Sequence, residues 1–279
     1  MKTISDADFT FLRQLVFGLS QNVLDPSRDY LFETRLARVL RKRGMARLQD
    51  LVDSLRRKKD PELERAVAEA MTINETSFFR DRRPFELLRS DLLPRLIEAR
   101  RSTRSLRFWS AACSTGQEAF SLAILVKEHF PLLGDWNLRI EATDISQEMI
   151  QRAESGRFHR IEMNRGLPAR HVVRFFDREG EDWVIKPEIR KMCNFRQANL
   201  CAPFLPFSRA EERFDVILLR NVMLYFSQET RKTLMAAIRR LLAPDGVLFL
   251  GSTEQPADPS IWNTVLAGGT CYFTPICAN

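Results

Sequence analysis

Apolar residues recur at helical spacing in four stretches of the first seventy positions. In the first stretch Phe9, Leu12 and Val16 indicate an amphipathic helix, which Ser5 or Asp6 can cap. Asp-Pro pairs at 25–26 and 60–61 are typical helix starts, because a capping carboxylate precedes a proline at the first helical position. The second helix should then cover 26–43. We therefore predict an all-helical N-terminal domain over residues 1–70.

From residue 106 onward, short apolar runs alternate with amphipathic helical patterns. The runs at 106–112 and 214–219 are apolar enough for strands buried on both faces. This alternation is typical of an α/β domain with a doubly wound, mostly parallel sheet. We predict such a domain over 106–279, preceded by a linker and connecting helix over 71–105. Further strands are expected at 137–143, 247–250 and 270–274.

One segment interrupts the alternation. Strand-like runs at 172–176 and 183–185 flank a polar turn that contains Gly180, and a third run covers 192–198. We predict a small antiparallel β insertion at about 165–198.

Composition narrows the class of protein. The chain has 279 residues, 44% of them hydrophobic, which supports one sizeable core and a small accessory domain. Five cysteines without CxxC spacing and three scattered histidines favour a reduced chain without a metal site. We see neither a membrane-spanning run nor a secretory signal, so a cytoplasmic protein without membrane insertion is expected.

Positive charge is concentrated in the helical domain. Residues 28–60 hold eleven Lys/Arg and five Asp/Glu, whereas the whole chain has a net charge of +7. Arg28, Arg35, Arg38 and Lys42 share one stripe of the second helix. A solvated helix face is one interpretation. Such clustering also suits an anionic partner, whether nucleic acid, membrane or acidic protein.

Two positions near the first strands suit a nucleotide-like ligand. Small residues at 113–116 join the strand at 106–112 to a helix, so a ligand can approach free backbone N–H groups there. Asp144 follows the next strand, where carboxylates accept hydrogen bonds from ribose hydroxyls. An ordinary buried turn and a helix cap are the alternative interpretations.

The linker at 72–81 combines polar side chains with two adjacent phenylalanines. It can be a capped connection with its aromatics in the core, or a lid over a cofactor. The planar guanidinium of Arg80 suits a carboxylate. Polar residues also follow the apolar strand at 214–219, at the strand end where parallel sheets bind ligands.

Five motifs together resemble one known family, the bacterial chemotaxis receptor methyltransferases (CheR family). They are NETSFFRD (74–81), AACSTGQEAFSLAI (111–124), ATDIS (142–146), NL (199–200) and FDVILLRNVMLYF (214–226). The likeness covers nearly the whole chain, in the right order. It implies a class I S-adenosylmethionine-dependent methyltransferase that forms methyl esters on glutamates of the chemoreceptor cytoplasmic helical bundle, with S-adenosylhomocysteine as product.

The resemblance also implies roles for individual residues. Arg80 and Tyr225 would be catalytic, as positioning groups. Arg35, Arg38 and Lys42 would bind the receptor. Glu118 would lie near the amino-acid part of the cofactor, and Asn199-Leu200 near its adenine. The full set of implied cofactor contacts is Asn74, Thr76, Arg80, Glu118, Asp144, Asn199, Leu200, Arg220 and Asn221.

The residues fit this chemistry. A glutamate carboxylate with a pKa of ~4.3 is deprotonated at neutral pH, so methyl transfer to it needs no general base. Alignment and exclusion of water can supply roughly 7–11 kcal/mol. The chain accordingly shows no Ser/His/Asp or Cys/His set.

Three other functions fit the residues less well. A nucleic-acid methyltransferase often has Pro-Pro after the fourth strand, but positions 220–223 read RNVM, so a nucleic-acid partner is not expected. CSTGQE is not the G-x-G-x-x-G of nicotinamide enzymes. A non-catalytic receptor-binding protein is the third possibility. Some family members hold a tethering peptide of the receptor C-terminus on the insertion, but the short turn around Gly180 argues against tethering here.

Overall fold

The computed structural model describes residues 4–202, 207 and 213–276. Two compact units make up the chain. The helical unit comprises Met1–Ile73 and Tyr225–Thr230, and the sheet unit comprises Asn74–Leu224 and Arg231–Asn279.

The helical unit folds around the apolar stripes of its helices. Its elements are α1 (Asp6–Ser20), the 3-10 turn η1 (Pro26–Arg28), α2 (Tyr30–Lys42), α3 (Leu48–Arg57) and α4 (Pro61–Ala70). Phe9, Leu12, Leu36 and Leu51 are almost fully buried in one hydrophobic cluster. The predicted stripes therefore do face a common core.

The caps explain where these helices begin. Ser5 forms a capping box with Asp8, and Asp60 accepts hydrogen bonds from the N–H groups of Glu62 and Leu63 at 3.1 and 3.0 Å. The predicted start of the second helix is wrong. The Asp25 carboxylate caps only the short 3-10 turn, and α2 begins four residues later than position 26, at Tyr30.

The sheet unit is built on a seven-stranded sheet of order β6-β2-β1-β7-β8-β10-β9. Strands β6, β2, β1, β7 and β8 run parallel, and β10 is antiparallel to both β8 and β9. The predicted doubly wound, mostly parallel sheet is confirmed. The strands are β1 (Ser105–Ala111), β2 (Asn137–Asp144), β6 (Cys193–Gln197), β7 (Phe214–Leu219), β8 (Leu242–Leu250), β9 (Trp262–Ala267) and β10 (Thr270–Pro275).

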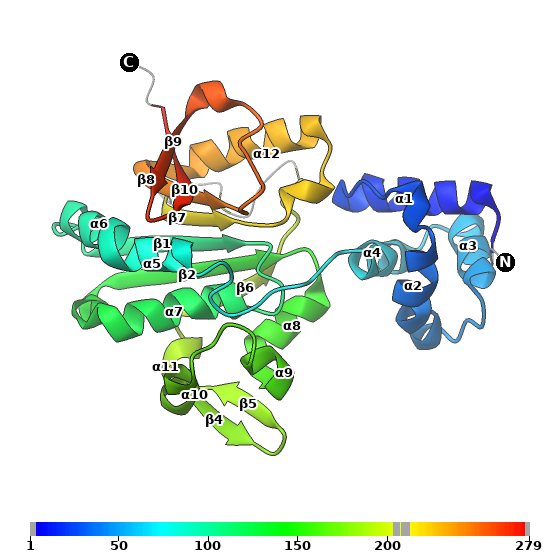
Figure 1. Cartoon of the computed structure of the whole chain (residues 1–279). Helices are drawn as coiled ribbons and strands as arrows, with labels where there is room; N and C mark the ends of the chain where they lie inside the picture. Colours follow the sequence, from blue (N-terminus) through cyan, green and yellow to red (C-terminus); the bar gives the residue numbers. More distant parts are fainter. Residues whose placement is uncertain (1–3, 203–206, 208–212, 277–279) are drawn as a thin grey trace. The chain divides into compact units, whose positions relative to one another are not determined.

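Helices cover both faces of this sheet. Helices α7 (Gln117–His129) and α8 (Gln147–Ser155) lie on one face, and α12 (Gln228–Leu241) lies on the other (Figure 1).

The connecting segment contributes α5 (Arg83–Leu87), the π-turn η2 (Leu88–Leu92) and α6 (Leu93–Ala99), with Pro94 in the first turn of α6. Three further short turns are η3 (Pro131–Asp135), η4 (Met223–Tyr225) and η5 (Pro259–Ile261).

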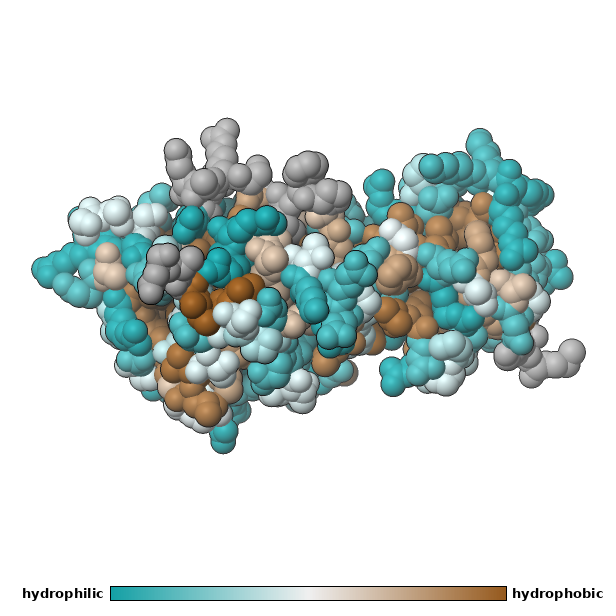
Figure 2. Space-filling model, turned by 90° about the horizontal axis from the view of Figure 1, so that it is seen from above, coloured by the Kyte–Doolittle hydropathy of each residue, from teal (hydrophilic) through white to brown (hydrophobic). Residues whose placement is uncertain are grey.

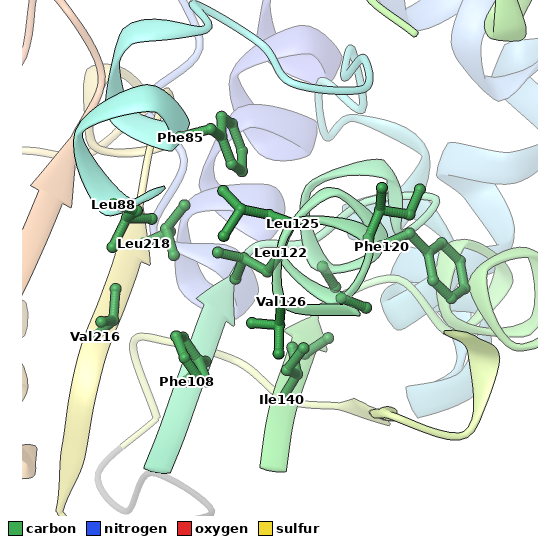
Figure 3. Close-up of a cluster of buried hydrophobic side chains, with 14 of the residues drawn as sticks. Phe85, Leu88, Phe108, Phe120, Leu122, Leu125, Val126, Ile140, Val216 and Leu218 are labelled. Carbon is green, nitrogen blue, oxygen red and sulfur yellow. The ribbon is translucent and has the colours of Figure 1, made fainter. Parts of the chain in front are cut away.

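The core beneath α7 joins residues that lie far apart in the sequence. Phe85 of α5 and Leu122 of α7 pack over Phe108, Ile140 and Leu218 of neighbouring strands (Figure 3). Because alternate strand residues point to the same face, each central strand supplies side chains to this layer. This core therefore holds α7, which begins directly after the β1 turn, against the strands of the sheet.

The antiparallel insertion is confirmed, but one of its predicted strands is mostly helical and another is a strand of the main sheet. Its three-stranded sheet has the order β3-β5-β4, made of β3 (Arg157–His159), β4 (Phe176–Glu179) and β5 (Asp182–Ile185). Residues 172–175 belong to helix α10 (Ala169–Phe175), which turns His171 and Phe175 inward together. The run at 192–198 supplies β6, which pairs in parallel with β2 of the main sheet. Helices α9 (Arg160–Met163) and α11 (Pro187–Arg190) complete the insertion.

Figure 2 shows one face of the molecular surface. Hydrophilic residues cover much of the face shown in Figure 2, with patches of hydrophobic residues between them. Among the residues that the structure describes, none of the helices has the length and apolar character needed to cross a membrane.

Candidate active site

The turn between β1 and α7 has a strained backbone. Ala112, Ser114 and Gly116 have φ angles of 62°, 50° and 91°, in the left-handed region that favours glycine. A Cβ atom at Gly116 would lie 3.0 Å from the Ala153 Cβ and 3.1 Å from the Phe120 ring, so a larger residue has little room. The turn thus holds backbone N–H groups at the sheet's carboxyl edge, next to the strand order reversal at β1.

Asp144 lies at the end of β2 and faces this turn. Its Oδ2 accepts a hydrogen bond from the Ser114 N–H at 2.8 Å, and its Oδ1 accepts one from the Ser146 N–H at 2.9 Å. Burial raises the pKa of Asp144 above its ordinary value, whereas these backbone hydrogen bonds act in the opposite direction. Ser146, rather than Asp144, caps α8 through its hydroxyl.

Glu118 and Arg220 form a buried ion pair. Arg220 Nη1 donates to Glu118 Oε2 at 2.9 Å, and the exposed fractions of the two side chains are 1% and 12%. The Ser110 hydroxyl donates to Glu118 Oε1 at 2.7 Å. Burial raises the pKa of Glu118, and the charge of Arg220 opposes this shift. Arg220 Nη2 also donates to Asp81 Oδ2 at 2.7 Å, so the guanidinium joins two carboxylates.

Asn221 follows Arg220 at the end of β7 and has a φ of 59°. The Glu254 carboxylate holds this bend, because Oε2 accepts from the N–H groups of Asn221 and Gly251 at 2.8 and 2.7 Å. In the described part of the chain, Asn221 Oδ1 is buried and has no hydrogen-bond partner. A ligand donor is one way to satisfy such an atom.

Residues 74–82 form the segment that we call the cofactor loop. The Ser114 hydroxyl donates to the carbonyl of Asn74 at 2.7 Å, which attaches the loop to the β1 turn. Arg80 Nη1 donates to the Glu75 carbonyl at 2.9 Å, and Thr76 is half-buried. An open hollow of about 500 Å³ is lined by Ser77, Phe78, Phe79, Arg80, Asp81, Arg82, Arg83, Glu86 and Gly166.

Asn199 and Leu200 follow β6 at the same edge of the sheet. The preceding N–H, of Ala198, donates to the Asp144 carbonyl at 2.8 Å, and Leu200 is buried. Asn199 Oδ1 accepts from the Cys201 N–H at 2.9 Å. The structure therefore gathers residues of five sequence motifs around the ends of β1, β2, β6 and β7.

The remaining candidates belong to the helical unit. Arg38 and Lys42 are exposed on α2. Arg35 is half-buried, and its Nη1 donates to the carbonyls of Met71 and Thr72 at 2.9 and 3.3 Å, beyond the end of α4. Tyr225 is half-buried, and its carbonyl accepts from the Val23 N–H at 2.8 Å.

Sequence reasoning missed three supporting residues. Asp81, Ser110 and Glu254 carry none of the predicted roles, although each bonds to a predicted site residue or to its backbone. Glu254 alone had a signal, since it follows closely on the strand predicted at 247–250. The partners of the other two are visible only in the folded chain.

Comparison with known proteins identifies the family of the chain. Residues 74–268 match the family model "CheR methyltransferase, SAM binding domain", and residues 7–72 match "CheR methyltransferase, all-alpha domain". The chemotaxis protein methyltransferase 1 of Pseudomonas aeruginosa is 37% identical over 254 residues, covering 90% of each chain. Chemotaxis protein methyltransferases of Pseudomonas putida (35% identical, 88% of this chain and 90% of that one) and Vibrio parahaemolyticus (34%, 90% of each) are also similar. The chain belongs to the CheR methyltransferase family.

Proposed function

We propose that this chain transfers the methyl group of S-adenosylmethionine to glutamate carboxylates on the cytoplasmic helices of chemoreceptors, giving glutamate methyl esters. Relatives that are named chemotaxis protein methyltransferases support the proposal. One observation carries it: Asp144, Glu118 and Asn221 converge with the cofactor loop at the carboxyl edge of the sheet, within the segment that matches a SAM-binding domain.

The residues at this edge fit the cofactor. The two oxygens of Asp144 accept the N–H groups of Ser114 and Ser146, and a carboxylate has about four lone-pair sites, so acceptor capacity remains for a ribose hydroxyl. Glu118 is a partly accessible carboxylate for the cofactor's amino group, and the unpartnered Asn221 Oδ1 can accept a further donor. Asn199 and Leu200 are assigned to the adenine, and Asn74 and Thr76 to further cofactor contacts. With Arg80 and Arg220 they make up the proposed binding set.

The chemistry asks little of the protein beyond alignment. When bound, S-adenosylmethionine supplies an electrophilic methyl group whose leaving group is a neutral thioether. The acceptor glutamate is already ionised at neutral pH, so no side chain has to remove a proton. Arg80 and Tyr225 are the proposed positioning groups for the acceptor. Arg80 uses Nη1 for the Glu75 carbonyl, and its other donors suit a carboxylate.

The receptor is proposed to bind along α2. Arg38 and Lys42 are exposed there and present positive charge to an acidic helical surface. The Arg35 guanidinium donates to carbonyls beyond the end of α4. We therefore propose that Arg35 stabilises this surface and also contributes to its positive charge.

Cofactor binding is the first test. Calorimetric titration of S-adenosylhomocysteine into the wild-type chain should give a micromolar Kd, roughly −8 kcal/mol. Asp144→Asn keeps the size of the side chain but removes its charge, and it should weaken binding at least tenfold. Asp177→Asn changes an exposed aspartate on β4 and should bind like the wild type. A flat wild-type titration would refute the methyltransferase proposal and favour a non-catalytic receptor-binding protein on a methyltransferase fold.

Identification of the acceptor is the second test. The chain is incubated with methyl-labelled S-adenosylmethionine and a chemoreceptor cytoplasmic fragment. Glutamate methyl esters release labelled methanol in alkali, whereas N-methyl groups stay attached. Label that resists alkali, or that enters added nucleic acid instead of the fragment, would contradict the proposal.

A further inference from the structure

The cofactor loop packs against the antiparallel insertion through an aromatic cluster. The Phe78 side chain is fully buried, and its ring lies edge-on to Phe158 of β3 and Phe176 of β4, with centroid distances of 5.0 and 5.6 Å. Such edge-to-face pairs contribute about 0.5–1.5 kcal/mol each beyond the area they bury. One end of the insertion's core is therefore filled by a residue of the cofactor loop.

A glycine of the insertion permits this close approach. Gly166, between α9 and α10, has a φ of +88°, and a Cβ atom there would lie 2.0 Å from the Phe78 carbonyl oxygen. No side chain fits at that distance, so any other residue must displace the loop backbone or the α9–α10 connection.

Two more contacts lie on either side of Phe78. Arg165 Nη2 pairs with Glu75 Oε1 at 2.7 Å. The Phe79 ring lies 5.4 Å from the His171 ring, whose Nε2 is 2.8 Å from Glu128 Oε2 on α7. The insertion thus contacts three residues of the loop, from Glu75 to Phe79.

The loop backbone needs such support. Phe79, Asp81 and Arg82 have φ angles of 49°, 63° and 42°. Non-glycine residues in this region cost of order 1–3 kcal/mol each and persist only when their surroundings fix them. On the other side of the loop, the Phe79 N–H donates to the Ser121 hydroxyl at 2.9 Å and the Arg80 carbonyl accepts from Arg220 at 2.8 Å.

We infer that the insertion is a brace for the cofactor loop, and that Gly166 and Arg165 are positioning residues for cofactor binding. This inference rests on the proposed function. It gives the insertion a role inside the enzyme: the insertion holds Asn74, Thr76 and Arg80 in the conformation that receives the cofactor.

Two glycines of the insertion make a matched test. Gly180 also has a positive φ, +64°, but a Cβ atom there meets nothing within 4 Å. Gly166→Ala and Gly180→Ala thus share the backbone strain, and only the first meets Phe78. Calorimetry with S-adenosylhomocysteine should show about tenfold weaker binding for Gly166→Ala, a loss of about 1.4 kcal/mol. Gly180→Ala should stay within about twofold of the wild type.

Hydrogen exchange provides a readout that does not depend on binding. Without ligand, amides of residues 74–82 should exchange faster in Gly166→Ala than in the wild type, with Phe79 the most sensitive. Exchange in this segment should be unchanged in Gly180→Ala. In steady-state methylation, the KM for S-adenosylmethionine should rise more than kcat falls, since two of the three braced residues, Asn74 and Thr76, are proposed to contact only the cofactor.

The exposed Arg165–Glu75 pair keeps the inference testable if Gly166→Ala fails to fold. Arg165→Gln and Glu75→Gln should each weaken cofactor binding about twofold, in the range of surface ion pairs, and the double variant should be no weaker than either. Wild-type binding and exchange in these variants, or in a folded Gly166→Ala, would refute the brace and leave the proposed function intact. Absence of cofactor binding by the wild type would refute both.

Discussion

Arg220→Met is the substitution from which we expect the largest loss of stability in the sheet unit. It keeps an unbranched side chain of moderate length but removes the charge that faces Glu118 and Asp81. Arg220 is 1% exposed and lies 2.9 Å from one carboxylate and 2.7 Å from the other. After the substitution Glu118 is a buried anion that keeps the hydrogen bond from the Ser110 hydroxyl and a weaker favourable interaction with the charge of Arg80.

The size of the loss follows from the burial of the two partners. Removing one member of a buried ion pair typically costs 3–5 kcal/mol, because the other charge is left uncompensated. Asp81 is 40% exposed, so water replaces its lost partner and its contribution is small. Glu118 keeps one hydrogen bond and slight exposure, which places the expected loss near the lower limit, at about 3 kcal/mol. A unit of this size should then melt roughly 6–12 °C lower.

The tryptophans make this loss measurable for the sheet unit alone. All four, at 109, 136, 183 and 262, lie after residue 73 and outside 225–230. Urea unfolding followed by tryptophan fluorescence therefore reports the free energy of unfolding of the sheet unit. Arg83→Met is the control, since Arg83 is an exposed arginine of the same unit that donates to the Gly269 carbonyl.

The dependence on pH tests the assigned cause. Burial already raises the pKa of Glu118, and loss of Arg220 raises it further. Between the unfolded and folded pKa values the folded variant binds the extra proton, so its stability falls as pH rises through this window. The deficit relative to wild type should therefore be largest near pH 7 and shrink towards pH 4.5. A deficit below about 1 kcal/mol at pH 7, or one that does not depend on pH, would refute the reasoning.

Three other substitutions test separate features. Gly116→Ala should cost about 1–3 kcal/mol in urea unfolding of the sheet unit and weaken S-adenosylhomocysteine binding, because its Cβ has no room. The Ser5 hydroxyl holds the pKa of Asp8 below its ordinary value. The stability that the ionised Asp8 carboxylate contributes to the fold is therefore present at neutral pH, and it is lost as pH falls through the folded-state pKa of Asp8. Asp8→Asn should cost about 1 kcal/mol at pH 7 and progressively less as the pH falls below the ordinary aspartate pKa, measured by exchange of α1 amides. Arg35→Met should cost about 1 kcal/mol by exchange of α4 amides, through its lost carbonyl contacts.

Local signals made much of the fold predictable. The central strands are continuous apolar runs, and β1, β2 and β7 were all predicted within a few residues of their observed ends. The run at 172–176 was predicted wrongly because valine and phenylalanine favour strands. Tertiary packing decides otherwise, since His171 and Phe175 are buried together on one side of α10.

A site residue was predictable from the sequence where a polar residue directly follows a predicted strand. Asp144 met this condition, and the structure places it against the β1 turn. Arg220 met it as well, but its partners Glu118 and Asp81 could not be predicted, because they are 102 and 139 positions away along the chain. A hydrogen-bond network between such distant positions has no local pattern in the sequence. It exists only once the sheet brings the strand ends together.

The helical unit is discontinuous in sequence, which matters for anyone who wishes to produce it separately. Residues 225–230 belong to it, and the Val23 N–H and Thr230 hydroxyl donate within it to the Tyr225 carbonyl and the Gln21 side chain. A truncated gene that stops after Ile73 lacks Tyr225 and Thr230, so the Val23 N–H and the Gln21 side-chain oxygen lose these hydrogen-bond partners. Expression of the isolated helical unit should therefore join residues 225–230 to it through a short engineered linker, so that the design is an internal deletion rather than a simple truncation.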